Sequence, residues 1–145
     1  PVPTNNRTVE EAAAAYEKAV PTVLNACEKT ELDLVLLGLG DDGHTASLFP
    51  KSSVLQEQDH IVVAVKDGKV WNRVTMTFPL LTSAKHVWFT VVGDSKAAAL
   101  ARVFRQRRDY ADESWQDRIG RVLPGAVLTQ DTVEWFVDEA ASAGN

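Results

Sequence analysis

The chain has 145 residues, of which 45% are hydrophobic, and its 15 Lys and Arg against 20 Asp and Glu leave a net charge of −5. This length and composition predict one compact domain over residues 1–145. The acidic balance excludes nucleic-acid binding through bulk positive charge, and the single cysteine excludes an internal disulfide. No apolar run approaches the roughly 20 residues that cross a bilayer. We therefore expect a soluble, cytoplasmic domain with no nucleic-acid or membrane partner.

The first predicted element is a helix that begins after Thr8. Thr8 and Glu11 have the spacing of a capping box. Apolar residues then recur at helical intervals as far as Val20. Pro21 has no amide hydrogen and crowds the preceding turn, so we expect it to end or kink the helix.

Strands and helices alternate along the rest of the chain. The strongest strand signal is the nearly continuous apolar run of residues 32–37, which ends in Gly38 and is typical of a parallel strand buried on both faces. Further strands are predicted over residues 61–65, 74–78, 87–92 and 133–137, and helices over residues 95–104 and 138–142. The polar residues 106–118 are expected at the surface. This alternation indicates a layered α/β fold.

The most informative segment, residues 38–50, directly follows the strongest strand. Open α/β sheets bind ligands at the carboxyl ends of their strands. Gly38, Gly40 and Gly43 allow the backbone to approach a ligand closely, with amides that would face an anion or a developing oxyanion. These glycines also fit the dinucleotide fingerprint G-x-G-x-x-G, but Pro50 comes too early for the long helix that this fingerprint requires.

His44 is the candidate catalytic residue of this segment. An imidazole suits proton transfer near neutral pH, and Asp42 is close enough in sequence to orient or polarise it. Spacing alone favours this interpretation no more than a histidine that only hydrogen-bonds to the loop backbone. A metal site of Asp41, Asp42 and His44 is disfavoured, because three ligands in one tight loop have poor geometry.

Residues 36–50 closely resemble the signature of the 6-phosphogluconolactonases, which form one group with the glucosamine-6-phosphate deaminases. Both branches share an Asp-Gly-His core, and the Thr-Ala-Ser-Leu-Phe-Pro that follows it here is similar to the lactonase branch. Residues 72–77, 92–97 and 134–141 resemble further motifs of the family. The resemblance implies a Rossmann-like, mostly parallel sheet with flanking helices.

The resemblance also implies an activity: hydrolysis of 6-phospho-D-glucono-1,5-lactone to 6-phosphogluconate in the oxidative pentose phosphate pathway. His44 would act as the general base with Asp42 beside it, and neither a metal nor an organic cofactor would be needed. Two alternatives stay open. One is an enzyme similar to the glucosamine-6-phosphate deaminases and isomerases, and the other is a non-catalytic module that binds sugar phosphates.

Four residues are candidates for substrate binding. Gly40 and Gly43 would contact the substrate within the loop, and the resemblance implies that Arg73 and Lys96 hold its phosphate. Without the family, Arg73 would be read as a surface arginine paired with an acid. Lys96 falls in the first turn of a predicted helix, where its charge opposes the helix macrodipole, and an unfavourable local choice of this kind indicates a function.

The family is longer than this chain, and the segments expected in the N-terminal part of the family fold are missing. Pro1 would then fall in the middle of the parent fold. Removing strands from a parallel sheet exposes an edge and apolar faces. We therefore expect self-association through the exposed sheet edge, or reduced stability.

Overall fold

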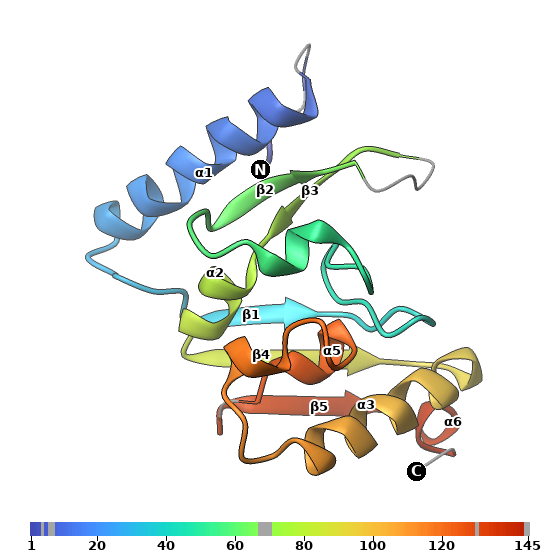
Figure 1. Cartoon of the computed structure of the whole chain (residues 1–145). Coiled ribbons are helices and arrows are strands. Elements are labelled where there is room, and N and C mark those ends of the chain that lie inside the picture. The colour runs from blue at the N-terminus through green and yellow to red at the C-terminus, as the bar shows by residue number, and fades with distance from the viewer. Residues whose placement is uncertain (4, 6–7, 67–70, 130, 144–145) are drawn as a thin grey trace.

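The computed structural model describes residues 1–3, 5, 8–66, 71–129 and 131–143. Three strands form a parallel sheet in the order β1-β4-β5, namely β1 (Leu34–Leu37), β4 (His86–Val91) and β5 (Val133–Val137) (Figure 1). The strands β2 (Val62–Val65) and β3 (Arg73–Met76) form a separate antiparallel pair. The α/β fold with a mostly parallel sheet is confirmed, with this pair as the antiparallel exception.

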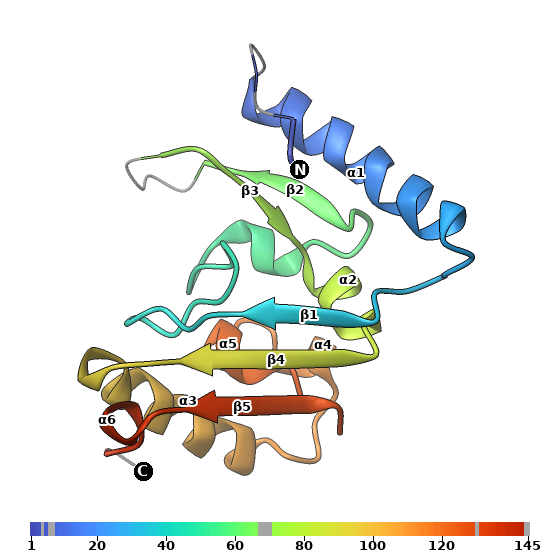
Figure 2. The same ribbon diagram turned by 180° about the vertical axis from the view of Figure 1, so that it is seen from behind.

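Helices cover one face of the parallel sheet. The helices α3 (Ala97–Asp109) and α5 (Pro124–Val127) lie in front of the sheet in Figure 1 and behind it in Figure 2. Strand residues that point toward them, Val87 and Phe89, are fully buried. The remaining short elements are η1 (Ser53–Gln56), α2 (Phe78–Ser83), η2 (Asp94–Lys96), α4 (Trp115–Arg118) and α6 (Glu139–Ser142).

The opposite face of the sheet is open, and Figure 2 looks onto it. Leu36 is 64% exposed and Phe136 is 47% exposed on this face. The prediction that residues 32–37 are buried on both faces is therefore wrong: β1 alternates between exposed and buried positions. Parallel sheets normally have both faces covered, so this chain presents an unusual apolar surface.

The first helix, α1 (Val9–Ala26), packs on the β2–β3 pair and begins as predicted. Oγ1 of Thr8 accepts a hydrogen bond from the amide of Glu11, whose carboxylate accepts one from the amide of Thr8 in return. Pro21 does not end the helix. Val20 and Leu24, on either side of it, belong to the apolar cluster beneath the helix, and this packing offsets the lost hydrogen bond.

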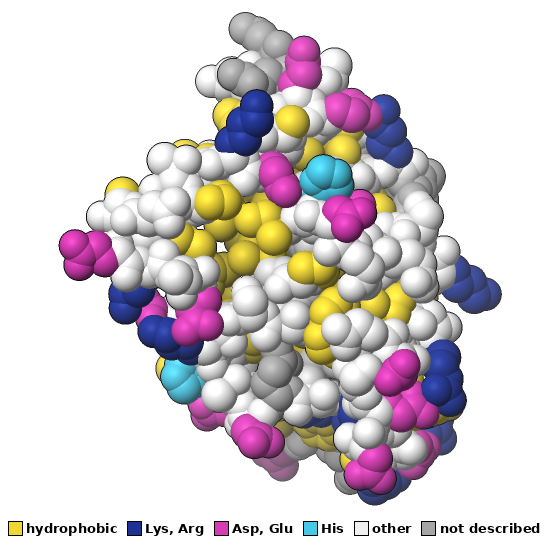
Figure 3. Space-filling view, turned by 60° about the vertical axis from the view of Figure 1, so that its left-hand side comes forward, with side chains coloured by type: hydrophobic (Ala, Val, Ile, Leu, Met, Phe, Trp, Pro, Cys, Tyr) yellow, Lys and Arg dark blue, Asp and Glu magenta, His cyan; other side chains and the backbone are white. Residues whose placement is uncertain are grey.

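That cluster forms a second, smaller core between α1 and the β2–β3 pair. Its buried members are Ala13, Val20, Val62 and Leu80. On the side where the chain passes from α1 to β1, hydrophobic side chains gather in a hollow with acidic and basic groups around it (Figure 3). The molecule therefore has two unequal cores, and the larger one lies between the parallel sheet and α3.

Two other expectations need correction. Phe78 does not continue β3 but begins α2, where Pro79 occupies the first turn. Residues 106–118 do not lie wholly at the surface, since Arg118 is only 1% exposed. Its guanidinium donates to three backbone carbonyls, those of Ala111 (2.9 Å), Glu113 (3.0 Å) and Ala126 (3.4 Å). Burial lowers the pKa of Arg118, because desolvation disfavours the charged form.

Candidate active site

The glycine-rich loop lies at the carboxyl end of β1 and is closed by its own hydrogen bonds. The hydroxyl of Thr45 donates to the carbonyl of Gly38 (2.9 Å), and the amide of Gly40 donates to the carbonyl of His44 (2.8 Å). The amide of Gly43 donates to the carbonyl of Gly40 (2.9 Å). Because both amides are used within the loop, Gly40 and Gly43 shape the site here and do not offer these N–H groups to a ligand.

Asp42 holds the ring of His44. Its Oδ1 lies 2.6 Å from Nδ1 of His44 and also accepts a hydrogen bond from the His44 amide (3.1 Å). An ionised carboxylate only accepts hydrogen bonds, so Nδ1 is the donor in this contact, and in a neutral ring Nε2 would carry the lone pair. The structure therefore brings Asp42 and His44 together, and the carboxylate fixes the orientation of the imidazole.

Gly40 allows the ring of His44 to lie against the backbone. A Cβ added at Gly40 would stand 2.0 Å from Nδ1 of His44, far inside contact distance. Gly43 allows the loop to pack against Leu123. Its φ is +86°, and a Cβ added there would stand 2.7 Å from the Leu123 side chain. Its carbonyl accepts a hydrogen bond from the amide of Gly125 in α5 (3.0 Å).

His44 opens into a pocket of about 340 Å³ at the end of β1. Gly40 and Lys96 line the same pocket, together with Leu36 from the open face of the sheet. The ammonium of Lys96, which precedes α3, forms an ion pair with Asp41. The pocket thus brings an imidazole, an ammonium and loop backbone together at the carboxyl end of β1.

Arg73 approaches the site through Phe49. The guanidinium carbon of Arg73 lies 5.6 Å from the centre of the Phe49 ring, whose centre lies 4.5 Å from that of the His44 ring. Arg73 is exposed at the start of β3 and is not among the residues that line the pocket of about 340 Å³. The structure therefore places Arg73 beside the site, on a different element from Lys96.

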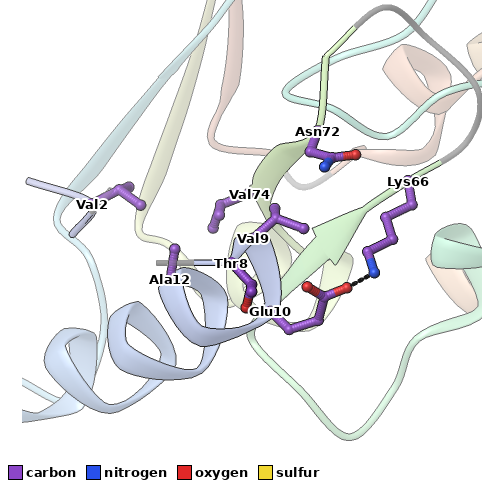
Figure 4. A pocket seen from close by; sticks show the side chains of 8 residues that line it. All are labelled: Val2, Thr8, Val9, Glu10, Ala12, Lys66, Asn72 and Val74. Atoms are coloured by element: carbon purple, nitrogen blue, oxygen red, sulfur yellow. Dashed lines mark ion pairs between the residues drawn. The ribbon is translucent and has the colours of Figure 1, made fainter. Parts of the chain in front are cut away.

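A larger pocket, of about 670 Å³, lies elsewhere, between the start of α1 and the β2–β3 pair (Figure 4). Its lining includes Glu10 and Lys66, which form an ion pair with each other, and Asn72. Among its described lining residues there is no histidine or cysteine that would act as a base or nucleophile. Chemistry, and not size, therefore selects the pocket at His44 as the candidate active site.

Among the described residues, no three His, Cys, Asp or Glu side chains come together as the ligands of one metal ion would. No helix formed by these residues has the length and apolarity to cross a membrane.

Sequence reasoning missed two side chains of the site. Asp41, which the sequence analysis considered only as a metal ligand, pairs with Lys96, 55 residues further along the chain. Phe49 is buried and contacts both Arg73 and His44. As the single aromatic ring besides His44 in residues 38–50, Phe49 was a usable signal, whereas the partner of Asp41 depends on how β1 and β4 pair.

The fold and the site together define an α/β protein whose ligand pocket lies at the carboxyl ends of parallel strands. A family profile described as "Glucosamine-6-phosphate isomerases/6-phosphogluconolactonase" matches residues 1–135. The chain belongs to this family.

Individual relatives agree with this assignment. A 6-phosphogluconolactonase of Nostoc is 39% identical over 145 residues, which cover 98% of this chain and 56% of the relative. The human 6-phosphogluconolactonase is 38% identical over 138 residues, covering 92% and 49%. The solved 6-phosphogluconolactonase of Trypanosoma cruzi superposes with a TM-score of 0.66 at 27% identity, covering 95% of this chain and 53% of that one. The chain thus spans about half the length of the relatives it matches.

Proposed function

We propose that this chain carries the catalytic base and part of the phosphate site of a 6-phosphogluconolactonase. The observation that carries the proposal is the His44–Asp42 pair, which faces a pocket that it shares with Lys96. The relatives named 6-phosphogluconolactonase support it. The substrate would be 6-phospho-D-glucono-1,5-lactone and the product 6-phosphogluconate.

In this mechanism Nε2 of His44 takes a proton from water, whose oxygen attacks the lactone carbonyl carbon. A tetrahedral intermediate forms, and its bond to the ring oxygen then breaks while His44 returns the proton to that oxygen. Asp42 holds Nδ1–H and stabilises the imidazolium between the two steps. General acid–base catalysis of this kind contributes about 10²–10⁴-fold to the rate.

Lys96 and Arg73 would hold the substrate phosphate at a distance from the reacting carbon. Binding energy from this remote group positions the carbonyl near the base and so accelerates the reaction. Gly40 and Gly43 would act by letting the ring of His44 and the loop lie close to the substrate. Nothing in this mechanism calls for a metal or an organic cofactor.

The test compares His44→Ala with His86→Ala. His86 is an exposed histidine at the opposite, amino-terminal end of β4, so its substitution is a matched control. We expect His44→Ala to lower the hydrolysis rate of the lactone by about 10²–10⁴-fold, with binding of 6-phosphogluconate by calorimetry little changed. Equal rates for the two variants would remove His44 from the mechanism.

Two outcomes of the same assays would favour other functions. Release of ammonia from glucosamine 6-phosphate, without lactone hydrolysis, would favour a deaminase. Binding of 6-phosphogluconate without any turnover would favour a non-catalytic module, a candidate because the chain spans about half of its relatives.

Self-association and a cytoplasmic location are further parts of the proposal. The open face of the sheet exposes Leu34, Leu36 and Phe136, and β1 forms an edge of the parallel sheet. A second copy that covers this surface would remove it from water. Light scattering should then report a mass above the monomer, and Leu36→Glu should shift it toward the monomer.

Fractionation of cells that produce the chain tests the cytoplasmic location.

A further inference from the structure

Lys96 and Asp41 form an ion pair at the pocket of His44, and the two partners differ in their exposure. The side chain of Lys96 is 28% exposed and lines the pocket, whereas that of Asp41 is 70% exposed. Asp41 therefore reaches the ammonium from the solvent side. When the ion pair breaks, the Asp41 carboxylate is therefore hydrated more easily than the Lys96 ammonium.

We propose that Asp41 is a displaceable counter-ion that sets the affinity of the pocket for phosphorylated ligands. The inference rests on the proposed function, in which Lys96 holds the substrate phosphate. Without a ligand, Asp41 neutralises the ammonium. When a phosphorylated ligand enters, its phosphate takes the place of the carboxylate on Lys96, and Asp41 turns into solvent.

The binding of phosphate is then an exchange of one anion for another. The observed affinity is the gain from the phosphate–ammonium contact minus the loss of the carboxylate–ammonium contact. A phosphate dianion gains more from the ammonium than a carboxylate with a single charge, so the exchange is favourable. Asp41 weakens binding by the free energy of its own contact and by repulsion of the incoming anion.

Other carboxylates near the pocket do not serve this role. Asp42 is engaged by the backbone amide and the ring nitrogen Nδ1 of His44. Asp94, two residues before Lys96, is exposed, and within the described part of the chain it has no ion pair with the ammonium. Asp94→Asn therefore makes the same change of charge as Asp41→Asn, close to the same lysine, without breaking the contact.

The experiment titrates the 145-residue chain and its two variants with 6-phosphogluconate by calorimetry at one fixed ionic strength. We expect Asp41→Asn to bind about two- to fivefold more tightly than the unsubstituted chain, the range that one partly exposed ion pair supplies. We expect Asp94→Asn to change the affinity much less than Asp41→Asn does. Equal tightening in both variants would overturn the inference, because a general change of charge would then explain it.

A second pair of variants shows whether the effect passes through Lys96. In the Lys96→Met background, Asp41→Asn should tighten binding less than it does in the unsubstituted chain, since the contact with Lys96 is already absent and only the repulsion of the incoming anion is relieved. Equal tightening in both backgrounds, or no tightening in either, would overturn the inference. Lactone hydrolysis is measured on the same samples. No hydrolysis together with tightening specific to Asp41→Asn would refute the proposed function and leave the counter-ion role standing.

Discussion

One carboxylate oxygen of Asp42 accepts two hydrogen bonds from His44, at 2.6 Å from the ring nitrogen Nδ1 and at 3.1 Å from the backbone nitrogen. The contact with the backbone amide fixes the position of the His44 main chain, and the contact with Nδ1 fixes the orientation of the imidazole ring. A single side chain thus sets both the position and the tautomer of the proposed base.

Asp42→Asn should lower kcat for lactone hydrolysis by about 10²–10⁴-fold and leave KM nearly unchanged. The amide keeps an acceptor for the His44 backbone, but the charge that stabilises the imidazolium is lost. Steady-state kinetics with the lactone measure the effect. The exposed Asp112, at which Asp112→Asn makes the same change, is the control. A fall in affinity without a fall in kcat would contradict the role assigned to Asp42.

Gly40→Ala should move the ring of His44 and lower kcat by about 10²-fold, the cost of misplacing a catalytic group by about 1 Å. The added methyl group would stand 2.0 Å from Nδ1, whereas at Gly38 it would meet nothing within 4 Å. Gly38→Ala is therefore the matched control in the same loop, and it should keep its activity. If the two variants were equally active, the close packing of the ring on Gly40 would be irrelevant to catalysis.

Arg118→Met should lower the free energy of unfolding by about 2–3 kcal/mol. The reason is that the three backbone carbonyls that accept hydrogen bonds from the guanidinium would lose their donor. Urea denaturation at neutral pH measures this loss. Arg105 is exposed on α3, so Arg105→Met should change stability little. A similar small change at both positions would mean that water replaces the guanidinium without cost.

Asp138 should make stability depend on pH in the acid range. Hydrogen bonds from the amides of Ala141 and then Gly93 lower the pKa of Asp138 below its ordinary value of 3.8. The unfolded chain therefore binds a proton on Asp138 more readily than the folded chain does. Its contribution to stability is complete above the ordinary value and is lost as the pH falls through the lowered one.

The check compares urea denaturation of the unsubstituted chain and Asp138→Asn from neutral pH down to about pH 2. The difference in unfolding free energy between them should shrink as the pH falls. Glu139→Gln, in the exposed first turn of α6, should leave the acid dependence unchanged. A constant difference between the chain and Asp138→Asn would show that the charge of Asp138 does not matter.

Much of the local structure could be predicted because it depends on neighbours in sequence. The capping box at Thr8, the strand before Gly38 and the strand at Val133–Val137 all appear where expected. The contact between Asp42 and His44 spans two residues, so the loop alone can form it. Pro21 does not end the helix, one of the two outcomes predicted for it, because packing of α1 on the β2–β3 pair outweighs a local helix-breaking preference.

The sequence by itself therefore determined the order of strands and helices and the chemistry of the loop at His44, because short-range periodicity, glycine positions and residue types carry that information. Only the tertiary structure decided which distant groups meet. The pairing of β1 with β4 brings Lys96 to Asp41, and the buried guanidinium of Arg118, at the end of α4, reaches the carbonyl of Ala126 in α5. Such contacts depend on how the strands and helices assemble, and local sequence patterns do not encode that geometry.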